Sequence, residues 1–344
     1  MAYEVTIGIP VYNVEKYIRR SMDSALAQTF QSIEFLVCDD CGTDSSMDII
    51  REYQHIHPRG KDIRIVRQQQ NGGIGNARNR ILDEATGKYL FFLDSDDAII
   101  PNAIELLYEN AKRYNAQIVY GSYERIEELG DQIKHIPFHY PSVQFLKEDE
   151  FAKYAYRRYE GIQATTWNFL IDIAVYRKNA LRYMPINFWE DFTFVMVLPI
   201  FISRAVLLPD ITYHYYVYFG SLSHLREREH VEKSEIKTVV DSLEVVKNRS
   251  CYYRRKEYFS KMVYKIMMTD LYVVCNILKN RRIISPDFSN KELQNIMKSP
   301  LTILEILKLR EWRLRNFALW LLSKLPSRLS VILIEIVGKS KGLI

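Results

Sequence analysis

The sequence lacks any apolar stretch that is long and uncharged enough to span a bilayer, which takes about 18 to 20 residues. Residues 1–4 lead directly into an apolar, strand-like run, without the basic and apolar leader of a signal peptide. Internal repeats and low-complexity tracts are also absent. We therefore expect a cytoplasmic protein that is either soluble or peripheral on the inner face of the membrane.

Cysteine is scarce, with four residues at Cys38, Cys41, Cys251 and Cys275. The first two have redox spacing, but they lie at the end of a predicted strand instead of opening a helix. No second pair of cysteines or histidines lies near them, which excludes the common zinc patterns. We expect reduced thiols, as is usual in the cytosol.

The excess of positive over negative charge is small. The 344 residues include 47 Lys+Arg and 42 Asp+Glu, which gives a net charge of +5 and a pI near 8.8. This balance fits anionic ligands or an anionic membrane surface better than nucleic acid, so we expect no nucleic-acid partner. Aromatic residues are abundant at 13%, and the 24 tyrosines suit ring stacking, an interface or a core.

The N-terminal part of the sequence alternates strand and helix patterns. Strands are expected at residues 5–9, 33–37, 63–66 and 89–93, and the segments between them carry apolar residues at helical spacing. Asn13 is expected to cap the first helix, and Gly87 to stop the third. The alternation predicts βαβ units and a largely parallel sheet, which binds its ligands at the carboxyl ends of the strands.

The rest of the chain divides into two regions. Residues 101–225 predict a helix at 102–115 and strands at 117–120, 173–177 and 212–217, the last of them rich in tyrosine. The sequence after residue 226 is helical in pattern, basic and aromatic. The predicted domains are therefore 1–225, with halves at 1–100 and 101–225, and 226–344.

The strand at 89–93 ends in the acidic run Asp94, Ser95, Asp96 and Asp97. Clustered carboxylates repel and raise one another's pKa, but they become favourable when a divalent cation lies between them and a polyphosphate. An acidic turn that caps the next helix is the alternative. Two other predicted strands also end in polar sequence, at 10–13 and 39–40. Because these ends would line one crevice, the coincidence favours a nucleotide site.

With these residues assembled, the chain resembles family 2 glycosyltransferases of the GT-A fold, over residues 3–225. The resemblance rests on ordered blocks: VTIGIPVYNVEKYI, VCDDCGTDSS, NGGIGNARNRILDEATGKYLFFLDSDD, WED followed by F, and Y-x-Y-x-x-x-x-G-S-L-S. It implies an α/β fold with a Rossmann-like, mixed, mostly parallel sheet flanked by helices, plus a C-terminal helical region. Such enzymes of bacterial polysaccharide and glycan biosynthesis move a sugar from a nucleoside diphosphate to an acceptor hydroxyl, usually with inversion.

The resemblance assigns the nucleoside to residues that follow the first two strands. Pro10, Tyr12 and Asn13 would touch the nucleoside. Asp39, with Asp40 beside it, would accept from the base N–H, as suits the imide of a uracil and hence a UDP-sugar. A turn and capping carboxylate is the alternative for Asp40.

The resemblance assigns the diphosphate and the metal to two further blocks. The loop Asn71, Gly72 and Gly73 opens a helix whose amides meet anionic groups, and Arg78 would reach the diphosphate or lie as an ordinary surface arginine. Asp94 would hold ribose or share the metal beside Ser95, and Asp96 would be the principal ligand of Mn²⁺ or Mg²⁺. His214 would complete the metal shell or be a partly buried strand histidine.

The remaining blocks concern the acceptor. Direct inversion needs a general base opposite the leaving diphosphate, and the family pattern places it at Asp191, with Glu190 as the fallback or an acceptor contact. Trp189 would face a sugar ring or pack in the core. Where many members have Tyr-Arg in the late strand, this chain has Tyr213-His214, so the arginine that would contact the diphosphate from this strand is missing.

The C-terminal third carries no specific motif. It is either a helical region that mediates homo-oligomer contacts or a basic amphipathic surface on the inner leaflet, where a lipid-linked acceptor would be presented. The leading hypothesis is a metal-assisted, inverting transferase that acts on a glycan or lipid-linked acceptor. The alternatives are a sugar nucleotidyltransferase and an inactive partner subunit that binds nucleotide sugars.

Overall fold

The computed structural model describes residues 3–129, 132–157, 162, 165–185, 190–218 and 230–344. The chain divides into two compact units, which are treated separately below. The first is Met1–Phe151 with Ala164–Ser221, and the second is Ala152–Gln163 with Leu222–Ile344.

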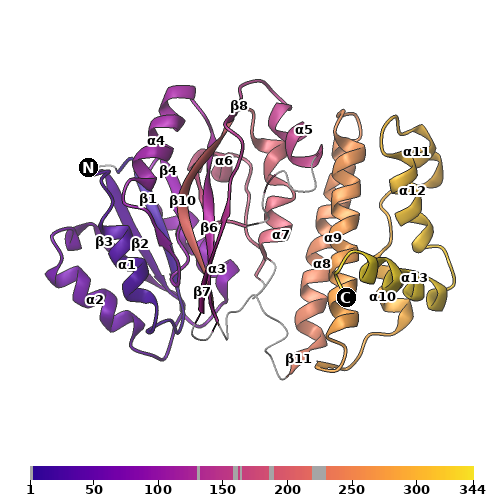
Figure 1. The fold of residues 1–344 in the computed structure, drawn as a ribbon, viewed down its shortest axis with the longest axis horizontal. Coiled ribbons are helices and arrows are strands. Elements are labelled where there is room, and N and C mark those ends of the chain that lie inside the picture. The colour runs from indigo at the N-terminus through magenta and orange to yellow at the C-terminus, as the bar shows by residue number, and fades with distance from the viewer. Residues whose placement is uncertain (1–2, 130–131, 158–161, 163–164, 186–189, 219–229) are drawn as a thin grey trace. The chain divides into compact units, whose positions relative to one another are not determined.

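The first unit is built on one mixed sheet with the strand order β3-β2-β1-β4-β9-β6-β10-β5, to which β7 and β8 are added beside β6 and β10. The strands are β1 (Val5–Val11), β2 (Ile33–Asp39), β3 (Ile63–Arg67), β4 (Tyr89–Phe92), β5 (Ala98–Ile99), β6 (Ile118–Leu129), β7 (Gln132–Phe138), β8 (Val143–Phe145), β9 (Phe169–Asp172) and β10 (Ala205–Tyr218). The first four are parallel, β9 runs antiparallel to β4 and β6, and β10 lies parallel to β6 (Figure 1). This is the mixed α/β sheet that the sequence predicts.

Helices cover both faces of this sheet because the strand residues alternate between two apolar layers. The helices of the first unit are α1 (Ile18–Leu26), α2 (Ser46–Ile56), α3 (Ile74–Glu84), α4 (Ala103–Tyr114), α6 (Ile173–Lys178) and α7 (Glu190–Val195), with turns of 3-10 helix at η1 (Gly60–Asp62) and η2 (Leu198–Phe201). Buried residues of α1, α2 and α4 share one core with Ile7 and Ile9 of β1. On the other face, a Cβ at Gly8 would lie 2.5 Å from Ile81 of α3, so this glycine lets the helix approach the sheet closely.

Three local predictions are wrong. Gly87 does not stop the third helix, because α3 already ends at Glu84 and its cap residue is Ala85.

The other two concern a strand and a helix cap. Residues 173–177 form the helix α6 and not a strand, because Asp172 ends β9 and its side chain accepts a hydrogen bond from Ala174 N as a helix cap. Asn13 does not cap the first helix, which begins at Ile18. Asn13 has φ 51° and instead binds the loop that follows β2.

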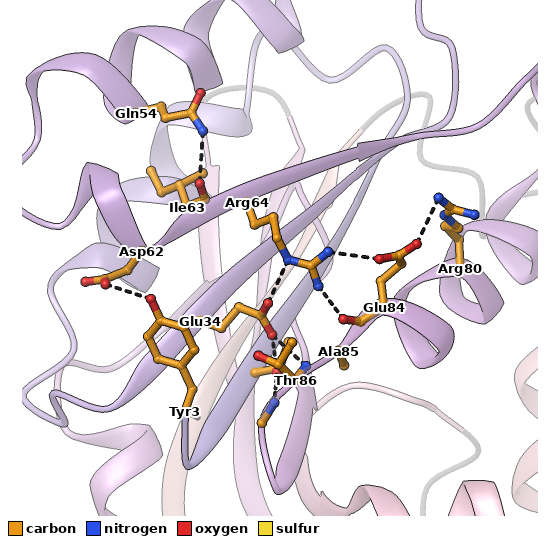
Figure 2. A network of polar contacts seen from close by, with 12 residues as sticks. Tyr3, Glu34, Gln54, Asp62, Ile63, Arg64, Arg80, Glu84, Ala85 and Thr86 are labelled. Carbon is orange, nitrogen blue, oxygen red and sulfur yellow. Dashed lines mark hydrogen bonds and ion pairs between the residues drawn. The ribbon is translucent and has the colours of Figure 1, made fainter. Parts of the chain in front are cut away.

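The buried carboxylate of Glu34 connects several segments at the edge of the sheet opposite the carboxyl ends of β1 and β2 (Figure 2). Glu34 accepts hydrogen bonds from Thr6 Oγ1 at 2.6 Å, Thr86 N at 2.9 Å and Arg64 Nε at 2.9 Å. Arg64 also bridges to Glu84 of α3 at 3.0 Å. Although burial opposes ionisation, these hydrogen bonds hold the pKa of Glu34 below its ordinary value. The network fixes β2, β3 and the end of α3 relative to one another.

The second unit is helical, as the sequence predicts for the C-terminal region. Its elements include β11 (Val231–Glu232), α8 (Lys233–Ser250), η4 (Cys251–Tyr253), α9 (Phe259–Lys279), β12 (Ile284–Ser285), α10 (Asn290–Ile296), α11 (Ile303–Lys308), α12 (Arg313–Leu322) and α13 (Ser327–Ser340). The unit also includes residues 152–157, which form most of α5 (Glu150–Arg157). The apolar helix α9 is the core element, since most of its residues are buried and α8, α10, α12 and α13 pack against it. None of the described helices is long and apolar enough to cross a membrane.

Candidate active site

Polar loops follow the parallel strands of the first unit at one edge of the sheet. β1 and β2 pair in register up to their last residues, Val11 and Asp39, and β4 runs beside β1. The loops after β1 and β2 are joined, because Thr43 N donates a hydrogen bond to Asn13 Oδ1 at 2.7 Å. A side chain at Gly42 would lie 3.0 Å from the same Asn13 oxygen, so glycine permits this approach. The two loops therefore lie side by side and form one rim at this edge of the sheet.

The residues expected to touch the nucleoside lie on this rim. Pro10 is buried within β1, whereas Tyr12, just beyond the strand, is 46% exposed and offers a ring to a ligand. Asp39 is buried at the end of β2, and one of its carboxylate oxygens lies 3.3 Å from Arg67 Nε. Together with Asn13, these residues provide an aromatic face, a carboxylate and polar backbone at one place.

Asp40 has a different environment from its neighbour. Its two carboxylate oxygens accept hydrogen bonds from the amides of Gly72 and Gly73, each at 2.9 Å. Burial raises the pKa of Asp40, and the two amides oppose that rise. The amides that we expected to meet anionic groups of a ligand thus bind a protein carboxylate here. Asp40 holds the 71–73 loop, with Asn71 exposed at its start, against the end of β2.

The acidic run after β4 folds into a tight turn that separates its carboxylates. Asp97 N donates to Asp94 O at 3.1 Å, and Ser95 within the turn is buried. The Asp97 side chain points inward, where it accepts hydrogen bonds from Tyr213 Oη and Tyr216 N, both at 2.8 Å. Burial and the neighbouring aspartates raise the pKa of Asp97 well above its ordinary value. Asp97 therefore joins β10 to the turn and does not cap α4.

Asp96 lies among aromatic and cationic groups from three segments. Its Oδ2 accepts a hydrogen bond from Tyr218 Oη at 2.7 Å, and its backbone oxygen accepts one from Arg20 at 2.7 Å. The Tyr218 ring lies on Tyr17, with 4.0 Å between the ring centroids. Burial, together with the charge of Asp94, raises the pKa of Asp96. A positive charge next to Asp96 would therefore be strongly stabilised.

Arg78 is the centre of the candidate site. Its side chain is 2% exposed, and its guanidinium bridges three carboxylates. Nη2 lies 2.9 Å from Asp94 Oδ1, Nη1 lies 2.9 Å from Asp191 Oδ1, and Nη1 also forms an ion pair with Glu190. Although burial opposes the charge, these carboxylates raise the pKa of Arg78 well above its ordinary value. The position excludes the alternative of an ordinary surface arginine, and it joins the end of β4 to the start of α7.

Asp191 lies at the start of α7, beside the Arg78 guanidinium. Burial and the charge of Glu190 raise its pKa well above the ordinary value, while Arg78 opposes the rise. Its Oδ1 also accepts a hydrogen bond from Thr166 Oγ1 at 3.0 Å, and its side chain remains 22% exposed. Glu190 is 7% exposed and is held by Arg78. Trp189, the expected acceptor contact, lies outside the described residues.

The described residues contain no group of three His, Cys, Asp or Glu side chains arranged to hold a metal ion. Asp94 and Asp96 are close enough for the charge of one to shift the pKa of the other, and carboxylate oxygens are the donors that Mn²⁺ and Mg²⁺ prefer. This donor pair fits such an ion. Burial lowers the pKa of His214, and the charged groups that act on it are Glu124 and His135. Neither Asp94 nor Asp96 is among them.

Several residues of the site were missed by sequence reasoning. Tyr218 and Tyr213 bind the acidic turn, Thr166 binds Asp191, and Arg20 binds the backbone of the turn. Tyr213 belongs to the tyrosine-rich strand that the sequence predicts, and Tyr218 directly follows its last residue. In this part of the sequence, however, only His214 was considered as a site residue. No motif marks Thr166 or Arg20, because their partners lie far away in the sequence.

Comparison with protein families and known proteins places this site in context. Residues 6–183 match the family model described as glycosyl transferase family 2. The chain is 39% identical to the glycosyltransferase GlyA of Streptococcus pneumoniae over 36% of its own length and 17% of that protein, and 40% identical to the chondroitin synthase of Escherichia coli over 38% and 19%. The cholesterol galactosyltransferase of Borreliella burgdorferi is 27% identical over 79% of this chain and 76% of that protein.

The chain thus spans less than a fifth of the length of GlyA and of chondroitin synthase, at 17% and 19%. Among solved structures, S. aureus TarS 1-349 in complex with UDP-GlcNAc matches 98% of this chain and 92% of that chain, with a TM-score of 0.70 and 16% sequence identity. This likeness confirms the expected GT-A fold, in which helices flank a curled sheet.

Proposed function

The chain belongs to glycosyl transferase family 2, and we propose that it transfers a sugar from a UDP-sugar to a hydroxyl group of a glycan or of a lipid-linked acceptor, with inversion at the anomeric carbon. The observation that carries this proposal is the bridge made by Arg78. One guanidinium holds Asp94, at the end of the strand that would face the donor, and Asp191, which would face the acceptor. The residue proposed to face the donor sugar and the residue proposed to face the acceptor thus bind the same buried guanidinium.

Direct inversion needs a base that takes the proton of the acceptor hydroxyl on the face opposite the leaving diphosphate. Asp191 suits this role because its raised pKa makes the carboxylate a better proton acceptor. Arg78 and Thr166 both bind Oδ1, so they orient the carboxylate, and Oδ2 would take the proton of the acceptor hydroxyl. Glu190, more deeply buried, would hold Arg78 in place.

The donor would lie along the rim formed by the loops after β1 and β2. Tyr12 would stack on the base, Asp39 would accept from its N–H, and Pro10 and Asn13 would contact the nucleoside through their backbone. The UDP-GlcNAc named for the TarS structure, whose fold this chain shares, supports the choice of a UDP-sugar.

A divalent cation, Mn²⁺ or Mg²⁺, would be held by Asp94 and Asp96. When bound, such an ion neutralises the charge that develops on the departing diphosphate. The protein's own contribution is to keep both carboxylates in one turn, with Tyr218 donating to Asp96 and Arg78 to Asp94. Asp97, turned inward, would remain a structural residue.

The proposal is tested by separating donor binding from transfer. We expect Asp191→Asn to bind UDP with unchanged affinity in calorimetry but to lose transfer by about 10² to 10⁴-fold, the usual contribution of a general base. Asp83→Asn is the matched control, because this exposed aspartate pairs with Arg182 on the surface. Robust transfer by Asp191→Asn would refute the base assignment, and failure of the wild-type protein to bind any nucleotide sugar would refute the function.

A further inference from the structure

The last three helices of the second unit carry just over half of the exposed large apolar side chains of the described chain. Seven of the thirteen exposed large apolar side chains lie there: Leu304, Leu307, Leu314, Leu321, Leu329, Ile332 and Ile336. Exposed apolar side chains that gather in this way mark an interaction site, whereas single ones are ordinary. We define the α11–α13 surface as these seven side chains together with the cations described next.

The same helices carry the net positive charge of the molecule. Residues 303–344 contain eight lysines and arginines against three glutamates, a net charge of +5 that equals the charge of the whole chain. The cations are Lys308, Arg310, Arg313, Arg315, Lys324, Arg328, Lys339 and Lys341. All eight are exposed, and none of them forms an ion pair within the described residues. Two of the glutamates, Glu305 and Glu311, pair with Arg254 and Lys261 outside the segment.

Each helix has an apolar stripe on its exposed side in addition to the one it buries. In α13, Leu329, Ile332 and Ile336 follow helical spacing on the exposed side, while Val331 and Ile334 pack inward. Leu314 of α12 is the most exposed of the set, at 79%. α11 packs on α12 and α12 on α13, so the three exposed stripes belong to neighbouring helices.

We infer that the α11–α13 surface docks on an anionic lipid bilayer and lies in its interface. Leucine and isoleucine side chains would enter the boundary between head groups and acyl chains, and the surrounding cations would bind the anionic head groups. The inference does not depend on the transferase activity proposed above, because it rests on side chains of the second unit alone.

A second copy of the chain fits this surface less well. A contact that pairs the surface with itself would bring two charges of +5 together, and like charges across an interface oppose association. Lysine, which supplies four of the eight cations, is also depleted at protein interfaces. A purely polyanionic partner would use the cations but would leave the leucines exposed to water.

The test is sedimentation of the full chain with vesicles of phosphatidylcholine, with and without phosphatidylglycerol. We expect the protein to pellet only with the anionic vesicles and to be released by salt. The variant Arg310→Gln/Arg313→Gln/Arg328→Gln should bind about 100-fold more weakly, since each cation near an anionic leaflet contributes roughly a factor of five. The control Lys61→Gln/Lys112→Gln/Arg113→Gln removes the same charge from exposed positions of the first unit and should bind as the wild type does.

The apolar contribution is tested in the same assay. Leu314→Ser/Ile336→Ser should weaken binding, whereas Ile56→Ser/Ile133→Ser, at similarly exposed positions of the first unit, should not. All four variants should keep the thermal unfolding temperature of the wild type, because the substituted side chains are exposed. Three results would overturn the inference: no binding of the wild type to anionic vesicles, equal loss in both charge variants, or a dimer in sedimentation equilibrium that only Leu314→Ser/Ile336→Ser dissociates.

Discussion

Removing the cation that holds three carboxylates should destabilise the protein far more than removing a surface arginine. Arg78→Met keeps much of the apolar stem but leaves Asp94, Glu190 and Asp191 without their shared partner. Breaking a buried ion pair by deleting one partner costs about 3 to 5 kcal/mol. Glu190 is 7% exposed, so leaving its charge unpaired should cost nearly this full amount. Asp94 and Asp191 are 21% and 22% exposed, so water partly screens their charges. We therefore expect a loss of about 4 kcal/mol in the free energy of unfolding.

The control for this prediction lies on the same helix. Arg80 of α3 is 44% exposed and pairs with Glu84 one turn away, so Arg80→Met should cost no more than about 0.5 kcal/mol. Both values would be measured by urea unfolding followed by circular dichroism, with the slope against urea concentration compared among the variants.

A double-mutant cycle separates charge from packing. In the wild type, Glu190→Gln removes one partner of Arg78, but in the Arg78→Met background it removes a charge that repels Asp191. We expect a coupling energy of about 2 kcal/mol between the two positions. A loss of less than about 1 kcal/mol in Arg78→Met, or a coupling energy near zero, would show that the guanidinium does not hold the cluster together.

Two further predictions concern buried carboxylates away from this cluster. Glu34→Gln should cost about 2 to 3 kcal/mol in urea unfolding, because the charged acceptor of Thr6 and Arg64 is lost; a cost as small as that of the exposed Glu52→Gln would contradict it. Asp270, paired with Lys247 at 3.1 Å, has a pKa that burial raises to about 7. A carboxyl with a raised pKa in the folded state stabilises it at low pH, so this contribution should be lost as pH rises from about 4 to about 7. Asp270→Asn should reduce the pH dependence of the free energy of unfolding over that range. An unchanged pH dependence would refute the raised pKa of Asp270.

The parallel core could be predicted from the sequence because its signals are local. Apolar runs of strand length, bounded by glycine and polar turns, place β1 to β4 close to where the structure has them. The failure at residues 173–177 has a local cause as well. The apolar pattern continues across Asp172, which ends β9 and caps α6, and periodicity alone did not show the change from strand to helix.

The connections within the site could not be predicted in the same way. From the sequence, Arg78 could have been either a ligand-binding residue or an ordinary surface arginine of a helix. Its partners Glu190 and Asp191 follow it by 112 and 113 residues, so no local pattern connects them. The role of Asp40 likewise depends on the amides of Gly72 and Gly73, which arrive from another loop. Motifs identified which residues gather at the strand ends, but tertiary structure decides which of them remain available to a ligand.

The distribution of charge in the site bears on where a metal would bind. Five carboxylates lie in the acidic turn and at the start of α7, namely Asp94, Asp96, Asp97, Glu190 and Asp191. Arg78 forms ion pairs with three of them, Asp94, Glu190 and Asp191. The fourth, Asp97, points inward, accepts a hydrogen bond from Tyr213 of β10 and has a raised pKa. Within the described residues, neither Asp96 nor Asp97 forms an ion pair through its side chain, but Asp97 accepts hydrogen bonds from Tyr213 and Tyr216 whereas Asp96 accepts one, from Tyr218. A cation supplied from outside would therefore gain most at Asp96, which supports the proposal that Mn²⁺ or Mg²⁺ binds there and shares Asp94 with Arg78.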